Sequence, residues 1–498
     1  MNLAVILFGI SIIIELLFFR SKHLQDRPVT LLTIAIVVIS SIYLLYRAPN
    51  IMVFVVFVIS SYRIFNLLRV IKGRMYSRYL KRSTSRTSLR LVEAQAVIIA
   101  VYLLFIDFSS FGVMMHLILI TTLLIQLITA IIIYAAAVSN KRSTIPLLST
   151  ESGNDLPTVS VCIPARNESN DLRNCLDLVV ASDYPKLEIL VLDDCSSDKH
   201  TPDIIRSYAQ AGVVFVPGTP PPNFWLAKNW AYDQLANAAN GEIIIFCGVD
   251  VRLGRSALSK TVAAMRSYNS NMISVIPKLS SVGANPFVQT MRYWWELALP
   301  RQLIKRPPVI STFWAIKSST LKKLGSFNSN RRMITPEAYF AKQLIANDKY
   351  KFLRDNGVFG ISTNKSFIEQ TDTAIRTRYP QLHKRPEMVL LLSATVFIAM
   401  VLPFVCAIVL WITGTIPALT SLVIALTYVT SYSIIIKSVR QKNLLSIAFM
   451  FPIAVIIDLF LLHLSMYRYE FTSVEWKGRN ICIPVMHMAP SSVRSVLK

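Results

Sequence analysis

Long apolar runs occupy both ends of the 498-residue chain, and a mixed polar segment lies between them. A helix needs about 20 predominantly apolar residues to cross a bilayer, and most of these runs reach or nearly reach that length. The pattern predicts a block of about five membrane helices before the middle segment and two or three after it. The runs are 2–19, 30–46, 51–68, 94–108 and 111–138, then 388–411, 416–436 and 444–466.

The middle segment has a different pattern. Short runs rich in β-branched residues alternate with helical-looking segments that begin near Glu168, Pro202 and Trp225. Strands that alternate with helices predict a parallel α/β sheet, which binds its ligands beyond the carboxyl ends of the strands. The expected strands are 158–163, 187–192, 212–216 and 242–246, and a polar linker at 140–156 precedes them.

Charge placement gives the expected orientation. The chain is 53% hydrophobic and carries a net charge of +24, and many basic residues lie in short stretches beside the apolar runs. Eight Lys and Arg residues fall between residues 69 and 90, whereas the neighbouring loops carry few charges. The positive-inside rule then puts the middle domain in the cytosol and the amino terminus outside. We expect a multi-pass protein of the plasma membrane. With no basic patch on a folded domain and no binding motif, we expect no nucleic-acid partner.

The last apolar run does not fit this alternation. Basic residues on both sides of 444–466 indicate that both flanks are cytosolic, which one full crossing does not allow. Pro452 and Asp458 interrupt the run. We therefore expect a re-entrant hairpin or an interfacial segment here.

Two further features limit the alternatives. The six cysteines are scattered, with no CxxC pair and no histidine at metal spacing, so neither a disulfide framework nor a zinc site is expected. The run at 2–19 lacks an early basic cluster and a cleavage site, so it predicts a retained helix rather than a signal peptide.

Polar residues follow three of the expected strands. They are 164–168 (PARNE), 193–198 (DDCSSD) and 247–251 (CGVDV). These ends converge on one edge of a parallel sheet, where carboxylates can bind a base or ribose, or hold a divalent cation against a diphosphate. Taken singly, each acidic turn is more simply a helix cap.

These motifs, together with 225–231 (WLAKNWA), resemble an inverting glycosyltransferase of family 2. The tail 476–479 (WKGR) resembles the ending of the hopanoid-associated, carotenoid and ceramide glycosyltransferase branch. The resemblance covers roughly 157–350. It implies an α/β GT-A (Rossmann-like) cytosolic domain flanked by transmembrane blocks. The expected divisions are 1–145, 146–380 and 381–498, the last with the WKGR tail.

The resemblance also implies roles for individual residues. Asp250 would be catalytic and would hold a divalent cation, Mg²⁺ or Mn²⁺. Trp476 and Arg479 would lie at the membrane face, near the acceptor. The nucleotide-sugar donor would be bound by Pro164, Ala165, Glu168, Asp193, Asp194 and Lys228.

Two positions depart from the family pattern. The first Asp of the DxD motif is Gly248 here, and the catalytic base is replaced by Ala338, next to Glu337. A hydroxyl acceptor needs a base, whereas a phosphate acceptor is already an anion. Either the acceptor is a polyprenyl phosphate, or Glu337 has become the base, or activity has been lost. Lys228, Arg331 and Arg332 are candidates to stabilise a departing diphosphate.

The segment 375–379 matches the QxxRW motif of processive synthases only at Arg378 and the aromatic residue after it. It predicts a basic, aromatic stretch at the membrane interface. The leading hypothesis for the whole chain is sugar transfer from a nucleotide-sugar to a lipid or other lipid-linked acceptor. The alternatives are a degenerate member that binds nucleotide-sugar or lipid without turnover, and a transporter or channel. The apolar runs hold few ionisable residues, whereas a transport path usually shows more.

Overall fold

The computed structural model describes residues 10, 12, 27–47, 51–72, 90–95, 97–98, 111–142, 155–279, 287–298, 307–355, 357, 359–411, 416–439 and 444–481. Most of the predicted helices at 2–19 and 94–108 lie outside the described residues.

A seven-stranded sheet forms the centre of the middle domain, in the order β3-β2-β1-β4-β8-β6-β9. β1 pairs in parallel with β2 and β4, and β2 pairs in parallel with β3, so the four predicted strands and their parallel pairing are confirmed. β8 runs antiparallel to β4 and β6, which makes the sheet mixed. The strands are β1 (Val159–Ala165), β2 (Leu187–Asp193), β3 (Val213–Pro217), β4 (Ile243–Cys247), β6 (Met272–Ile276), β8 (Phe313–Lys317) and β9 (Tyr350–Arg354).

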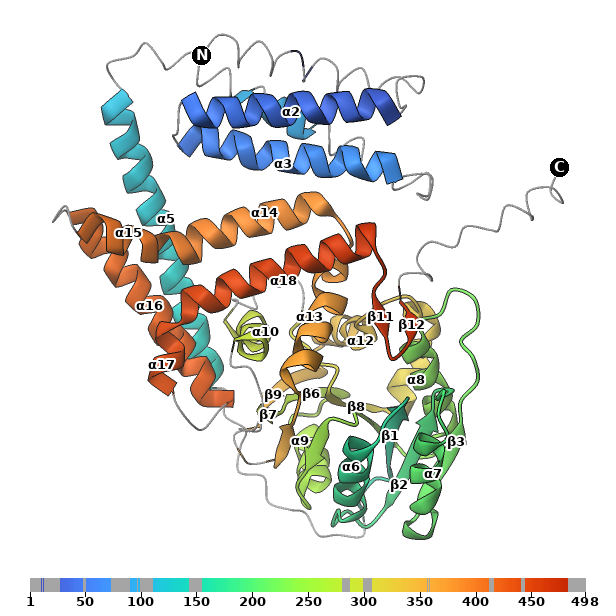
Figure 1. Ribbon diagram of the computed structural model, residues 1–498. Coiled ribbons are helices and arrows are strands. Elements are labelled where there is room, and N and C mark those ends of the chain that lie inside the picture. Colours follow the sequence, from blue (N-terminus) through green and yellow to red (C-terminus); the bar gives the residue numbers. More distant parts are fainter. Residues whose placement is uncertain are drawn as a thin grey trace.

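Each face of the sheet has its own core, because successive strand residues point to opposite sides. On β4, Ile243 and Ile245 pack with α6, α7 and α9, whereas Ile244 and Phe246 pack with α8 and α12. The result is a three-layer α/β sandwich (Figure 1). The helices are α6 (Asn170–Val180), α7 (His200–Ser207), α8 (Ala227–Ala238), α9 (Ala257–Ser267) and α12 (Pro336–Ile345), with the shorter α11 (Ser318–Lys323).

A second, three-stranded sheet in the order β5-β10-β7 lies beside the carboxyl end of β4. Its strands are β5 (Val251–Leu253), β7 (Lys278–Leu279) and β10 (Ile361–Thr363), and α10 (Val288–Leu297) and α13 (Phe367–Gln381) lie between this domain and the apolar helices.

Apolar helices at both ends of the chain flank this domain. Four are long and apolar enough to cross a membrane among the residues described: Leu119–Ser139, Pro386–Val409, Pro417–Lys437 and Phe451–Phe471. Leu31–Tyr43 and Val56–Phe65 are shorter apolar helical segments. The apolar helices and the mixed sheet confirm the predicted arrangement of a GT-A domain between two helical blocks. Figure 1 shows α18 between α14 and the sheet domain, with α2 and α3 beyond α14. The elements are α2 (Arg27–Arg47), α3 (Ile51–Lys72), α5 (Phe111–Arg142), α14 (Pro386–Val396), the π-helical turn Phe397–Val401, α15 (Leu402–Trp411), α16 (Ile416–Val439), α17 (Leu444–Phe449) and α18 (Phe451–Phe471).

The last apolar run forms two helices, α17 and α18, with a turn at Met450 between them. α18 is one helix from Phe451 to Phe471, and Pro452 lies in its first turn, where a missing N–H costs no helical hydrogen bond. Asp458 is buried in mid-helix, accepts a hydrogen bond from Trp295 Nε1 at 2.8 Å and pairs with Arg378. The run is therefore broken beside Pro452 and not at Asp458, and the re-entrant hairpin stays a prediction. The interfacial alternative stays a prediction.

The pair Arg378–Asp458 joins α13 of the sheet domain to α18. Removal of one partner from a buried ion pair leaves an uncompensated charge and costs about 3–5 kcal/mol. We expect Asp458→Leu to lower the free energy of unfolding by that amount, and Asp458→Leu with Arg378→Met to recover most of the loss. Denaturant titration in detergent micelles measures both changes.

The control is Asp203→Ala, which breaks an exposed pair with Arg206 and should cost about 0–1 kcal/mol. An Asp458→Leu loss no larger than this control would contradict the proposed role of the buried pair.

Candidate active site

The carboxyl ends of β1 and β2 lie side by side, as the sequence predicted. Ala165 and Asp193, the last residues of these strands, are direct partners in the register, and Pro164 precedes Ala165. The backbone N–H of Asp194 then donates to the carbonyl of Ala165 at 2.8 Å. The hydrogen-bonded ladder thus brings the motifs at 164–168 and 193–198 together.

The two strand-end loops are bound to each other through backbone conformations that few residues adopt. Asn167 and Cys195 have φ values of 46° and 49°. Asn167 donates its N–H to Ser196 Oγ at 3.0 Å, and its side-chain oxygen accepts from the N–H of Ser197 at 2.9 Å. Left-handed backbone at non-glycine residues costs energy and clusters at functional sites.

The tail hairpin closes over this edge. β11 (Glu475–Trp476) and β12 (Arg479–Asn480) are joined by Lys477 and Gly478, whose positive φ values of 49° and 75° are those of a type I′ turn. Arg479 Nη1 donates to both carboxylate oxygens of Asp194, at 2.7 and 2.8 Å. Lys477 Nζ lies 3.1 Å from a carboxylate oxygen of Glu168.

These contacts set the charge states at the edge. Burial raises the pKa of Asp194, and the hydrogen bonds and charge of Arg479 oppose that rise. Burial likewise raises the pKa of Glu168, against the charge of Lys477. Trp476 lies under the guanidinium of Arg376, 5.6 Å from the ring centroid. The structure thus places Arg479 against a residue expected to bind the donor, and the acceptor role of Trp476 and Arg479 stays a prediction.

Asp250 lies after β4, beside the small sheet. Its Oδ2 accepts a hydrogen bond from Thr363 Oγ1 at 2.9 Å and lies 3.5 Å from Lys365 Nζ. Burial alone would raise the pKa of Asp250, but Lys365 and Thr363 hold it below its ordinary value. Lys365 was not predicted from the sequence, because it lies 115 positions from Asp250 and in no motif of its own.

The residues at this position do not match the family's metal site. A Cβ on Gly248 would lie 2.6 Å from Asp250 Oδ1, so a second carboxylate does not fit unless Asp250 moves. Within the described ranges, no group of three or more His, Cys, Asp or Glu residues could hold a metal. The divalent cation therefore stays a prediction from the resemblance alone.

Lys228 and Glu337 form a second charged group behind Asp250. Lys228 is half-buried at the start of α8, and its Nζ lies 5.1 Å from the ring centroid of Tyr232. Burial lowers the pKa of Lys228, the charge of Glu337 raises it, and the cations Arg292, Arg376 and Lys365 lower it again.

Glu337 is completely buried, and neither carboxylate oxygen has a hydrogen-bond partner among the described residues. Ala338 is partly buried and packs against the core. Arg331 and Arg332 are exposed, and Arg332 lies over the ring of Phe224 at 4.5 Å, which is typical of a solvated loop.

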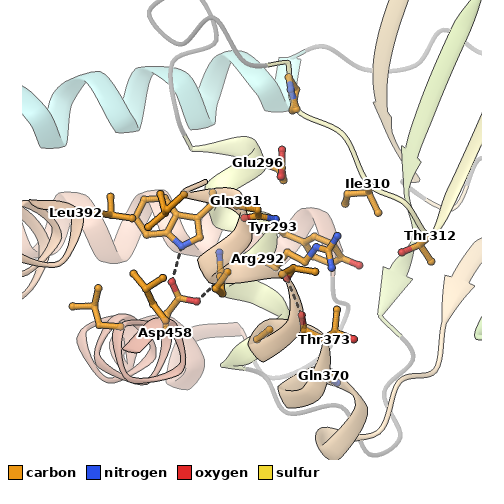
Figure 2. A pocket seen from close by; sticks show the side chains of 18 of the residues that line it. Arg292, Tyr293, Glu296, Ile310, Thr312, Gln370, Thr373, Gln381, Leu392 and Asp458 are labelled. Carbon is orange, nitrogen blue, oxygen red and sulfur yellow. Dashed lines mark hydrogen bonds and ion pairs between the residues drawn. The ribbon is translucent and has the colours of Figure 1, made fainter. Parts of the chain in front are cut away.

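A cavity of about 410 Å³ lies between this site and the apolar helices (Figure 2). Thr312, whose carbonyl accepts from the N–H of Gly248 at 3.0 Å, lines one side. Leu392 of α14 lines the opposite side, beside Asp458. Lys365 and Arg292 also line the cavity. The sequence signal for it was weak, since its residues come from four helices and several loops.

A mixed α/β sheet with charged residues gathered at its carboxyl edge resembles the GT-A class of fold. Residues 160–325 match the model of Glycosyl transferase family 2, and this part of the chain is a family 2 glycosyltransferase domain. The resemblance to family 2 is thereby confirmed, and the hopanoid, carotenoid and ceramide branch stays a prediction.

Similar proteins carry related descriptions. The chain is 29% identical over 189 residues to "Probable glycosyltransferase YdaM" of Bacillus subtilis (strain 168), and 43% identical over 58 residues to "Glycosyltransferase AglE" of Haloferax volcanii. These matches cover 36% and 11% of this chain, but only 44% and 19% of the two relatives. A solved mannosyltransferase, PcManGT from Pyrobaculum calidifontis in complex with GDP-Man and Mn²⁺, is 17% identical with a TM-score of 0.42, covering 69% of this chain and 98% of that one.

The ion pair between Arg479 and Asp194 gives a testable prediction. Hydrogen bonds to charged groups contribute about 1.5–3 kcal/mol, so Arg479→Gln should raise the open population of the hairpin roughly ten- to a hundredfold. Arg479→Lys should recover little, because an ammonium lacks the two-pronged geometry. Hydrogen–deuterium exchange of the peptide around 475–480 measures the opening.

Arg206→Gln, at an exposed pair, is the matched control and should leave that exchange unchanged. Asp194→Asn should accelerate exchange as Arg479→Gln does, and the double variant should add little, since both break one interaction. Unchanged exchange in Arg479→Gln would mean that other contacts hold the hairpin.

Proposed function

We propose that this protein is a membrane glycosyltransferase that moves a sugar from a nucleotide-sugar donor to a lipid-linked acceptor at the cytosolic membrane face, with inversion. The proposal rests on the cavity that joins the family 2 site to the apolar helices. Its Thr312 side adjoins Gly248 and Asp250, and its other side is formed by Leu392, Leu459 and Leu462 of two candidate membrane spans. An acceptor with a hydrocarbon tail fits such a two-sided cavity.

The charges along the cavity favour an acceptor with a phosphate at its reacting end. Arg292 and Lys365 line the cavity, and phosphates are commonly bound by such cations. Glu337, the candidate base from the sequence, is not among the described residues that line the cavity, although the carboxylate of Glu296 is. A phosphate acceptor needs no base, which agrees with Ala338 at the family's base position.

The donor lies, in this proposal, along the carboxyl edge near Ala165 and Asp193, with its diphosphate towards Lys228. The divisions 1–145, 146–380 and 381–498 describe the functional parts, with the catalytic domain on the cytosolic side of the plasma membrane. The four candidate spans support the membrane location, and the basic loops support the orientation.

One observation favours a second candidate, a nucleotide-sugar or lipid-binding protein without turnover. Both carboxylate oxygens of Asp194 are bound by Arg479, so in this arrangement they are not free for a donor. In the enzyme, the hairpin moves aside or the donor relies on Asp193.

Turnover by the full chain in lipid nanodiscs tests the proposal, with UDP- and GDP-sugars as donors and polyprenyl phosphate or alcohol-bearing lipids as acceptors. We expect transfer to polyprenyl phosphate that Asp250→Ala abolishes. Glu337→Gln should keep kcat within about tenfold, because no base is needed. Lys342→Gln, at an exposed position of α12, is the control.

Transfer only to alcohol-bearing lipids, with a loss of about 10²–10⁴-fold in Glu337→Gln, would instead make Glu337 the base. Donor binding without transfer or hydrolysis across the whole panel would favour the non-catalytic candidate.

The pH dependence of donor binding tests the role of Lys228. Phosphate binding needs the ammonium form, so affinity should fall as pH rises through the pKa of Lys228, which burial places below 10.5. Because the charge of Glu337 raises that pKa, Glu337→Gln should move the loss of affinity to lower pH. Titration of UDP and GDP binding against pH measures the shift. A midpoint that Glu337→Gln leaves unchanged would show that another group titrates.

A further inference from the structure

A lysine pairs with the carboxylate that, by the family resemblance, would hold a metal ion. Lys365 Nζ is 3.5 Å from Asp250 Oδ2, and the same oxygen accepts from Thr363 Oγ1 at 2.9 Å. The Lys365 and Asp250 side chains are only 20% and 19% exposed. Asp250 is the single carboxylate that the DxD motif retains, and its charge is already matched by an ammonium group.

The backbone fixes Lys365 in this place. In the antiparallel register of β5 and β10, Thr363 lies opposite Val251, and the N–H of Asn364 donates to the carbonyl of Asp250 at 3.2 Å. On the other side, Gln370 Nε2 donates to the carbonyl of Lys365 at 2.9 Å. A capping box between Ser366 and Glu369 then starts α13. The position of Lys365 is therefore set by a strand ladder before it and a capped helix after it.

Asp250, in its present position, occupies the space that a second carboxylate at position 248 would need. The φ value of Gly248 is not positive, so the backbone there does not require glycine. What glycine provides is space, since a Cβ would lie 2.6 Å from Asp250 Oδ1. The Gly248 substitution and the Asp250–Lys365 pair are thus two parts of one arrangement, in which Asp250 packs against residue 248 and binds Lys365.

Lys365 also faces the space where a substrate would lie. It lines the 410 Å³ cavity together with Arg292, and its charge acts on Lys228, as do those of Arg292 and Arg376. These four cations lie in a region that also holds the carboxylates Asp250, Glu337, Asp372 and Glu296. The ammonium group of Lys365 is thus placed to bind a phosphate oxygen in the cavity.

We infer that the ammonium group of Lys365 replaces the divalent cation and stabilises the diphosphate of the donor as it leaves. The inference rests on the proposed glycosyltransferase function. In the transfer, an oxygen of the acceptor phosphate bonds to the anomeric carbon as the bond from that carbon to the diphosphate oxygen breaks. The electron pair leaves with the nucleoside diphosphate, whose oxygen accepts hydrogen bonds from Lys365, and no proton is transferred.

Binding of UDP and GDP to the full chain in nanodiscs tests this inference by calorimetry, in excess EDTA and in MnCl₂. We expect one of them to bind with the same affinity in both conditions, within about threefold, and Lys365→Met to weaken binding by roughly ten- to a hundredfold in both. Lys365→Arg should recover part of the affinity, and Lys342→Met, at an exposed position, should bind as the wild type does. Transfer should persist in EDTA and fall about 10²–10³-fold in Lys365→Met.

The comparison of the wild-type protein in EDTA and in MnCl₂ does not depend on how well a variant folds. If wild-type binding or transfer is lost in EDTA and restored by Mn²⁺, the inference is overturned while the proposed function stands. Wild-type affinity in Lys365→Met would also overturn it. If neither nucleotide binds in either condition, the proposed function fails, and the inference fails with it.

Discussion

A carboxylate that a fold buries at a ligand-binding edge must be matched by a cation, because desolvation of an unpaired charge is costly. Three carboxylates at the carboxyl edge of this sheet follow that constraint. Asp194 is matched by Arg479, Glu168 by Lys477 and Asp250 by Lys365. None of the three cations comes from the main sheet or the helices packed on it. The edge is therefore complete only when later parts of the chain have folded onto it.

The apolar helices take part in that completion. Lys365 stands just before α13, which leads into α14, and α18 leads directly into the hairpin that carries Lys477 and Arg479. α13 packs along α18 and is joined to it by the buried pair of Arg378 and Asp458. A displacement of α18 relative to the sheet would act on both the cavity and the hairpin. The apolar block therefore positions the site as well as anchoring it.

What the sequence predicted and what it missed follow from the range of the interactions involved. The strands at 158–163 and 242–246 were found because β-branched runs and the turn residues after them are local signals. The antiparallel β8 was not, since its place depends on pairing with β4 across about 70 positions. Lys365 was missed for the same reason, although the sequence did show that Gly248 replaces the first Asp of the DxD motif. Asp458 was seen as an interruption of an apolar run, and its partners Arg378 and Trp295 became apparent only once α18 was packed.

A cation that belongs to the chain and a bound metal ion affect product release in different ways. A divalent ion is able to depart with the nucleoside diphosphate, whereas Lys365 is held by the β10 ladder and has to give up its hydrogen bonds to the product. Asp250, 3.5 Å away and fixed by Thr363, is placed to accept the ammonium group when the product leaves. The free energy of release is then the difference between two ion pairs instead of the loss of one. In this arrangement, Asp250 has a role at the site without a metal, as the partner of Lys365.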